Sequence, residues 1–258
     1  MNGLGTKWIG IERYHKKETG STNTDVRILA GQGSPEGTLV SADLQTAGKG
    51  RRGRTWKTEA GTALMFSVLL KPDISPDSAP QITLTMAMAV TKAIRDICGL
   101  DARIKWPNDV VVNGKKVCGI LTEMDMSADR IDHVIVGTGV NVNQTMIPEE
   151  LSQSATSLYL ETGKQLDKEE LLGEITRAFE EYYACFLVSC DMTRLKETYN
   201  GWLVSLNREV KVLDPQGEFT GISKGINEKG ELLVERSDKK TEAVYAGEVS
   251  VRGLYGYV

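Results

Sequence analysis

Residues 45–57 form the stretch of this sequence whose residue types and spacing most directly suggest chemistry. The stretch reads QTAGKGRRGRTWK and carries five cationic side chains and no acidic one. Glycine lets a backbone approach a ligand closely, and arginine pairs with phosphate or carboxylate oxygens through two N–H groups. Trp56 beside these cations suits stacking on a base or ring. We therefore expect a mobile loop that orders over an anionic ligand, with a solvated basic loop as the alternative.

The same residues contain a glycine pattern known from dinucleotide-binding loops. Gly48 to Gly53 matches G-x-G-x-x-G, and Asp73 follows at about the distance at which that motif places its acidic residue. The motif needs a helix directly after its last glycine, because the helix N-terminus holds the pyrophosphate. The residues after Gly53 lack helical spacing and lead into a β-rich run at 64–70. We therefore reject a dinucleotide fold.

The composition limits the class of protein and the kind of partner. The chain has 258 residues and a net charge of −4, which fits one large domain or a medium domain with a small one. A negative chain lacks the broad basic surface of non-specific nucleic-acid binders, so its cations are expected to serve a small anionic ligand. No long apolar run or signal-peptide core is present, so we expect a cytoplasmic protein that does not bind membranes. Four cysteines without a C-x-x-C pair, and only two histidines, argue against a zinc site and for reduced thiols.

Apolar periodicity and turn residues predict the elements that carry these motifs. Helices are expected at 21–31, 80–100, 171–186 (behind a capping pair, Asp167 and Glu170) and 191–202. Strands are expected at 38–44, 64–70, 102–107, 109–124 (a hairpin that turns at Asn113-Gly114) and 133–143. Because hairpins join most of these strands, we expect an α+β domain with a mixed or antiparallel sheet.

The sequence pattern changes near Leu206 to short strand runs. From there, strand runs are separated by the turn signals DPQG, NEKG and SDKK, at about the 8–12-residue spacing of small all-β units. This spacing predicts a small antiparallel barrel. We therefore divide the chain into a catalytic domain at 1–205 and a C-terminal domain at 206–258.

Five motifs stand in the order found in biotin–protein ligases, and this chain resembles that family over almost its whole length. They are STN at 21–23, QTAGKGRRGRTW at 45–56, KWPND at 105–109, GKKVCGILTE at 114–123 and GTGVNVN at 137–143. The later stretch GISKGINEKGELLVE…GEVSVR resembles the SH3-like terminal domain of the family. The resemblance implies a central domain like that of class II aminoacyl-tRNA synthetases, followed by a small SH3-like β-barrel.

The resemblance also implies a reaction and its partners. Family members use biotin, ATP and Mg²⁺ to make biotinyl-5′-AMP, and they then transfer biotin to a lysine of a biotin carboxyl carrier protein or domain. Many form homodimers through the central sheet. Bifunctional members carry an N-terminal winged helix, whereas only about twenty residues precede STN here. We therefore expect this chain to bind no DNA.

By this resemblance, the biotin site draws on residues from all five motifs. Lys105 and Arg51 are the expected catalytic residues. Lys49 stands where relatives carry arginine, so it keeps the charge but loses the forked geometry. The expected biotin-binding residues are Ser21, Thr22, Asn23, Gln45, Lys49, Gly50, Arg51, Lys105, Gly119 and Gly139, with Gly137 also suited to close backbone approach. The expected residues for ATP or the adenylate are Arg51, Arg54, Trp56, Asn108, Asn141 and Arg252, with Asp109 as a magnesium ligand.

Local structural interpretations stand beside these roles. Residues 21–23 could simply cap a helix, Lys105 could be an exposed strand residue, and Asn108 with Asp109 could open a hairpin. The glycines could mark strand bulges, and Arg252 could be an ordinary surface residue.

Three functions remain open beside one another at this point. The favoured function is biotin–protein ligase, and the nearest alternative is lipoate–protein ligase, which shares the scaffold. A non-catalytic regulator that binds biotin or nucleotide is the alternative from another class. Lipoyl and octanoyl transferases also share the scaffold and can use a cysteine, but Cys118 is expected in the core, and His133 is expected at a strand end rather than as a base.

Overall fold

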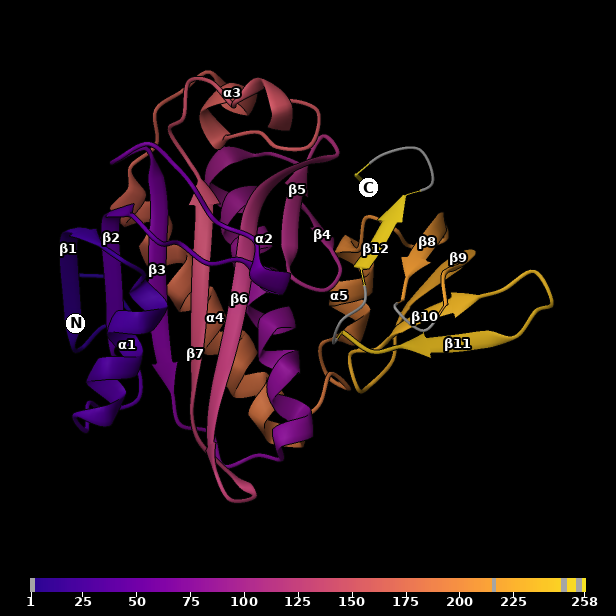
Figure 1. Ribbon diagram of the computed structural model, residues 1–258, viewed down its shortest axis with the longest axis horizontal. Coiled ribbons are helices and arrows are strands. Elements are labelled where there is room, and N and C mark those ends of the chain that lie inside the picture. The colour runs from indigo at the N-terminus through magenta and orange to yellow at the C-terminus, as the bar shows by residue number, and fades with distance from the viewer. Residues whose placement is uncertain (1–2, 215–216, 247–249, 254–256) are drawn as a thin grey trace.

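The computed structural model describes residues 3–214, 217–246, 250–253 and 257–258. These residues form a larger unit around a seven-stranded sheet and a smaller unit with a five-stranded sheet, which lie side by side (Figure 1). None of the helices in these ranges is long and apolar enough to cross a membrane.

The large sheet is mixed, as the sequence predicts. Its strands run in the order β1-β2-β3-β7-β6-β5-β4, and β1 pairs parallel with β2 while every other pair is antiparallel. The bounds are β1 Arg13–Thr19, β2 Leu39–Gln45, β3 Ala63–Leu70, β4 Arg103–Lys105, β5 Asp109–Val112, β6 Lys115–Ser127 and β7 Arg130–Asn141. The hairpin predicted at Asn113-Gly114 joins β5 to β6, and both turn residues have positive φ.

Edge strand β1 is missing from the sequence-based prediction. Its residues, RYHKKET, are mostly exposed and polar, so they carry no alternating apolar signal. The strand forms because its backbone pairs with β2, and this tertiary contact leaves no pattern in the side chains.

Helices cover both faces of the large sheet. The helix α1 (Thr22–Gly31) packs on one face, where Val26 meets Val40, Leu69 and Ile135. The long helices α2 (Ile82–Cys98) and α4 (Lys168–Ser189) lie behind the sheet in Figure 1 and share the main core with it.

The helix boundaries agree with the sequence in most places. The side chain of Asp167 accepts from the backbone of Glu169 and Glu170, so it caps α4 as expected. The helix predicted at 191–202 is shorter and begins only at Lys196, as α5 (Lys196–Trp202). The short α3 (Leu158–Thr162) was not predicted, because five residues are too few to show a helical period. Three 3₁₀ turns complete the helical elements: η1 Arg51–Gly53, η2 Pro76–Gln81 and η3 Glu149–Leu151.

The C-terminal unit is an antiparallel sheet in the order β11-β10-β9-β8-β12. Its strands are β8 Glu209–Leu213, β9 Phe219–Ile226, β10 Leu232–Glu235, β11 Thr241–Val244 and β12 Ser250–Gly253. The small antiparallel β unit is as predicted, and within the described ranges its end strands β11 and β12 are not paired with each other.

The two units pack directly against each other. The indole N–H of Trp106, next to β4, donates to the Gly230 carbonyl of the C-terminal unit at 3.0 Å in a buried contact. Buried side chains of the small sheet, such as Val210 and Val212, belong to the same apolar cluster as the core of the large unit. Packing therefore holds β4 and β5 close to the small sheet, at the place where the KWPND motif ends.

Candidate functional site

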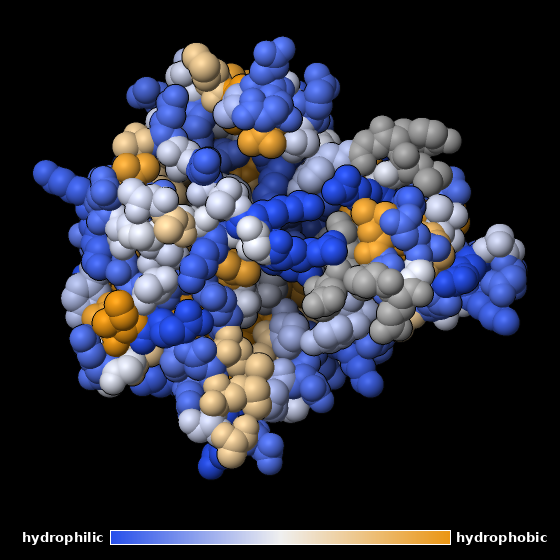
Figure 2. Space-filling view, viewed as in Figure 1, coloured by the Kyte–Doolittle hydropathy of each residue, from blue (hydrophilic) through white to orange (hydrophobic). Residues whose placement is uncertain are grey.

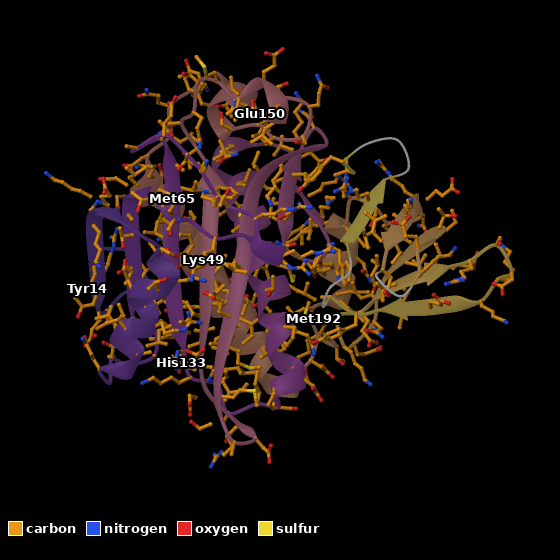
Figure 3. All side chains as sticks on the ribbon, in the orientation of Figure 1. Tyr14, Lys49, Met65, His133, Glu150 and Met192 are labelled. Carbon is orange, nitrogen blue, oxygen red and sulfur yellow. The ribbon has the colours of Figure 1, made fainter. Side chains whose placement is uncertain are left out.

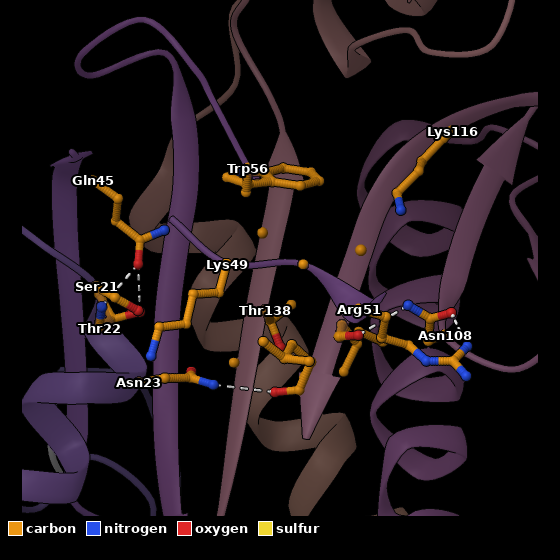
Figure 4. A pocket seen from close by; sticks show the side chains of 16 residues that line it. Ser21, Thr22, Asn23, Gln45, Lys49, Arg51, Trp56, Asn108, Lys116 and Thr138 are labelled. Carbon is orange, nitrogen blue, oxygen red and sulfur yellow. Dashed lines mark hydrogen bonds between the residues drawn. The ribbon is translucent and has the colours of Figure 1, made fainter. Parts of the chain in front are cut away.

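A cavity lies on the face of the large sheet beside the start of α1, beneath the loop that contains η1 (Figure 4). Strongly hydrophilic residues gather near the middle of this side of the molecule, between the large sheet and the C-terminal unit (Figure 2). The residues expected to bind biotin that line the cavity are Ser21, Thr22, Asn23, Gln45, Lys49, Gly50, Arg51, Gly119, Gly137 and Gly139. The expected nucleotide residues that line it are Arg51, Trp56 and Asn108.

A network of amide and hydroxyl groups forms one end of the cavity. Gln45 Oε1 accepts from the backbone N–H and the hydroxyl of Thr22, at 2.8 and 3.1 Å. The Ser67 hydroxyl lies 2.7 Å from Thr22 Oγ1 and 2.6 Å from Asn23 Oδ1. Asn23 Nδ2 donates to Glu123 at 2.7 Å. These buried groups present fixed donors and acceptors of the kind that can recognise a small polar ring.

Ser21 has the place of a helix cap but not its hydrogen bond. It is the N-cap residue of α1, yet its side chain makes no capping bond, and it is only 5% exposed. The capping interpretation of the STN motif is therefore wrong for the Ser21 side chain, which lines the cavity instead.

The floor of the cavity consists of glycines because other side chains cross the sheet there. A Cβ at Gly137 would lie 2.1 Å from Asn23 Oδ1, and one at Gly139 would lie 2.7 Å from the Trp56 ring. One at Gly119 would lie 2.9 Å from Lys116 Nζ. The ladder between β6 and β7 is regular at these glycines, so the bulge interpretation is wrong for them.

The basic loop folds back on itself above this floor. The Gly50 N–H donates to the Arg54 carbonyl at 2.7 Å, and the Trp56 N–H donates to the Gly48 carbonyl at 2.9 Å. Arg52, at its tip, is left-handed with φ of 58° and is exposed. Lys49 extends from the loop toward Asn23 (Figure 4). The loop therefore places a cation over the polar end of the cavity.

Arg51 joins the loop to both units of the molecule. Its guanidinium donates to Asn108 Oδ1 at 3.0 Å and to the carbonyl of Ala246 in the C-terminal unit. Burial lowers the pKa of Arg51, with Asp109 acting in the opposite direction. Asn108 also donates to the Ile120 carbonyl at 3.0 Å, so it bridges the loop and β6 as well as opening the hairpin.

Trp56 lies flat against the glycine floor. Its buried Nε1–H has no hydrogen-bond partner among the described residues, and Lys116 Nζ is 5.9 Å from the ring. A buried donor without a partner is costly, and the ring covers the place where a planar ligand would lie.

Two lysines flank one carboxylate beside the cavity, and two arginines lie near one of these lysines. Asp109 accepts from Lys116, and its electrostatic neighbours include Lys105. Burial alone would raise the pKa of Asp109, but Lys116 and Lys105 more than offset this and hold it below its usual range. Burial lowers the pKa of Lys105 to about 8, Asp109 opposes that shift, and Lys116, Arg252 and Arg54 add to it. Such a local excess of positive charge favours a polyanion.

The lysine that lines the cavity is not the one that the sequence suggests. Lys105 does not line the cavity, whereas Lys116, which was not singled out, does. A regular alternation would put Lys116 on the face of the buried Cys118, but the register of β5 and β6 shifts between Val110 and Val111. This irregularity lets Lys116 reach the cavity, and only the doubled lysine in GKKVCGILTE hints at it.

The remaining expected residues lie outside the cavity lining. Asn141 is buried and donates to the Thr156 carbonyl at 2.9 Å. Arg54 and Arg252 are exposed at the rim of the cation cluster. Burial raises the pKa of the Cys118 thiol well above its usual range, so Cys118 is a core residue and not a nucleophile, as expected.

The residues present do not form a protein cage for Mg²⁺. Both carboxylate oxygens of Asp109 accept hydrogen bonds, from Lys116 and from the Tyr257 hydroxyl. The described residues contain no cluster of three or more His, Cys, Asp or Glu side chains that could hold a metal. Octahedral Mg²⁺ needs oxygen ligands that are free to coordinate it.

Comparison with known proteins gives a consistent family. Residues 17–141 match the model of the biotin/lipoate A/B protein ligase family, and residues 205–252 match that of the biotin protein ligase C terminal domain. The chain is 36% identical to the bifunctional ligase/repressor BirA of Bacillus subtilis over 96% of this chain and 77% of that protein. It is 34% identical to the biotin–[acetyl-CoA-carboxylase] ligase of Paracoccus denitrificans, over 91% and 98% of the two chains. The solved structure of the Aquifex aeolicus biotin protein ligase in complex with biotin and ATP matches with a TM-score of 0.81 and 34% identity, over 94% and 99%.

Proposed function

This chain belongs to the biotin protein ligases, and from that premise we propose that it activates biotin with ATP as biotinyl-5′-AMP. In a second step it transfers biotin to a lysine of a biotin carboxyl carrier domain. The names of the Paracoccus and Bacillus relatives, and the biotin and ATP bound by the Aquifex neighbour, support this proposal.

One observation carries the proposal: a neutral polar network and a cation cluster lie at the two ends of one site. The network of Thr22, Asn23 and Gln45 suits the ureido ring of biotin. Lys116 and Arg51, at the other end, suit a carboxylate that meets the α-phosphate of ATP. Biotin has this same division between a neutral ring and an anionic tail.

We assign the first step to these cations. A biotin carboxylate oxygen forms a bond to the α-phosphorus, the bond from that phosphorus to the β-bridging oxygen breaks, and pyrophosphate leaves. Fixed positive groups offset the repulsion between the two anions and stabilise the charge that develops. We assign the carboxylate contact to Lys116, which lines the cavity, and the phosphates to Lys105, which ends β4 on the other side of β5.

We assign the retention of the intermediate to the basic loop. Biotinyl-5′-AMP is a mixed anhydride that water would hydrolyse, so the site must exclude water until the acceptor lysine arrives. The acceptor amine then attacks the acyl carbon, and AMP leaves with the electron pair. Arg51 supports this role because it ties the loop to Asn108 and to the C-terminal unit. Trp56 has the planar surface and the free N–H to pack against adenine once its ring turns off the glycine floor.

Magnesium is proposed to enter with ATP rather than to reside in the protein. It would neutralise part of the phosphate charge. Since both oxygens of Asp109 are engaged, we derive no step from a metal ligand in this chain.

Several wider properties remain proposals. We keep the division into 1–205 and 206–258, a homodimer formed through the large sheet, and a cytoplasmic location. Neither unit in the described ranges contains a winged helix, and we propose a carrier domain as the partner of this chain.

The test of the function is transfer of radiolabelled biotin to a purified carrier domain. We expect labelling that requires ATP and a single acceptor lysine. ATP–pyrophosphate exchange that depends on lipoate and not on biotin would establish the lipoate alternative. Tight biotin binding without exchange or labelling would establish the non-catalytic regulator.

A further inference from the structure

Tyr257 brings the C-terminal unit into direct contact with the cation cluster. Lys105 Nζ lies 4.0 Å from the centre of the Tyr257 ring, and the Tyr257 hydroxyl donates to Asp109 Oδ2. The other oxygen of Asp109 accepts from Lys116 Nζ. Tyr257, which follows β12 in the chain, therefore contacts both Lys105 and Asp109.

Contacts with both units hold Tyr257 in place. The neighbouring Val258 lies against the Gly114 turn between β5 and β6, and its carbonyl lies against Gly253 at the end of β12. Burial and the proximity of Asp109 raise the pKa of the Tyr257 hydroxyl, so the group stays protonated and acts as a donor to the carboxylate.

This geometry restricts the two lysines that the reaction needs. Hydrogen bonds to both of its oxygens fix the plane of the Asp109 carboxylate, and that plane sets the direction of Lys116 Nζ into the cavity. The Tyr257 ring restricts Lys105 through a cation–π contact. A free lysine side chain loses rotamer entropy when it is held in one position, so positioning it in advance favours binding of the transition state.

We propose that Tyr257 is a positioning residue for adenylate formation, acting on Lys116 through Asp109 and on Lys105 directly. This inference rests on the proposed function, because it concerns the cations of that same site. Nothing in the sequence marks Tyr257, which lies 141 positions after Lys116 in the chain.

The experiment compares Tyr257→Phe, Tyr257→Ala and the control Tyr14→Ala in biotin-dependent ATP–pyrophosphate exchange. Tyr14 is an exposed tyrosine on edge strand β1, far from the cavity (Figure 3). Absence of exchange in the unaltered protein would refute the proposed function itself, so the two failures are distinguishable. We expect Tyr257→Phe to lower kcat roughly tenfold, the size of one lost hydrogen bond to a charged group, with KM for biotin nearly unchanged.

Tyr257→Ala separates positioning from general stabilisation. This variant exposes Lys105 to solvent. The charged neighbours of Lys105 that remain are Asp109, Lys116, Arg252 and Arg54. We expect the alkaline limb of the rate profile to move to higher pH and the KM for ATP to rise. Tyr14→Ala should leave both unchanged. Exchange within twofold of normal in both Tyr257 variants overturns the proposal. A lower KM for ATP in Tyr257→Ala overturns it in favour of an obstructing side chain. If the alanine variant does not fold, the phenylalanine variant, which loses one oxygen atom, decides the question.

Discussion

Two lysines from neighbouring motifs have different surroundings, and those surroundings separate their proposed roles. Lys116 reaches the cavity and is held by Asp109, whereas Lys105 is half-buried outside the cavity lining and lies against Tyr257. Residue type and motif position made Lys105 the stronger candidate. The strand register brings Lys116 to the cavity, and we propose that Lys105 serves the phosphates.

Replacement of Lys116 tests its role at the carboxylate. We expect Lys116→Ala to lower biotin-dependent exchange at least about a hundredfold, because it removes a half-buried cation from the cavity wall and leaves Asp109 without that partner. Lys115→Ala, one position earlier and outside the cavity lining, is the matched control and should stay within about threefold. If both variants lost the same fraction of exchange activity at equal stability, Lys116 would have no specific role in the site.

The pH dependence tests Lys105. With its pKa near 8, Lys105 loses its charge as the pH rises through that value, so exchange should fall on the alkaline side with a midpoint near pH 8. Lys105→Arg keeps its charge at these pH values and should shift that fall upward, whatever its effect on the maximal rate. A midpoint that is the same in both proteins would assign the limb to another group.

Lys105 also makes the folding stability depend on pH. Folding lowers its pKa from 10.5 to about 8, so between these values the unfolded chain binds more protons than the folded chain. Stability therefore rises with pH across this window, because the burial cost of the charged form disappears.

At the scale of elements, the loop at 48–56 and the glycine floor beneath it work as a pair. The loop closes over the sheet through its own backbone bonds, and Trp56 and Asn23 can lie on the floor only because Gly139 and Gly137 have no side chains. The charge and glycine content of the loop are plain in the sequence. Its position above the floor depends on strands β6 and β7, which come more than fifty residues later.

Arg51→Gly tests the loop as the element that retains the intermediate. We expect the variant to release biotinyl-5′-AMP and to label lysines of unrelated proteins, because the bonds to Asn108 and Ala246 are lost. Arg52→Gly is the matched control, since Arg52 is exposed and its φ of 58° suits glycine. Labelling confined to the carrier domain in the Arg51 variant would show that retention lies elsewhere.

Gly137→Ala tests the floor. The new methyl group would meet Asn23 Oδ1 at 2.1 Å, so Asn23 must move and its bonds to Glu123 and Ser67 must change. We expect biotin affinity, measured by calorimetry, to fall at least about tenfold. Gly31→Ala, at the end of α1 with open space around it, should leave affinity unchanged, and equal affinity in both variants would contradict the prediction.

At the scale of the whole molecule, the C-terminal unit contributes to the site of the larger one. It supplies the Ala246 carbonyl to Arg51, Tyr257 to the cation cluster and Gly230 to Trp106. The two units share one apolar core, so they are packed together and are not separate domains joined by a linker.

Trp106→Phe tests that coupling. It leaves the buried Gly230 carbonyl without its donor, so the free energy of unfolding should fall by about 1–3 kcal/mol. Thermal unfolding followed by circular dichroism should show a single transition at a lower midpoint. Trp202→Phe provides the control and should lower the midpoint less. The half-buried ring of Trp202 packs against Tyr182 with 6.5 Å between the ring centres.

The sequence by itself determined the α+β class, the mixed sheet, most helices, the small β unit and the loop that lies over the site. These follow from local periodicity, turn residues and motif order, which act over short stretches of chain. Only the tertiary structure decided the polar edge strand β1, the place of Lys116 and the contact of Tyr257. Each depends on pairing or register between segments distant in the chain, and a backbone pairing or a one-residue shift of register leaves no mark in composition or spacing.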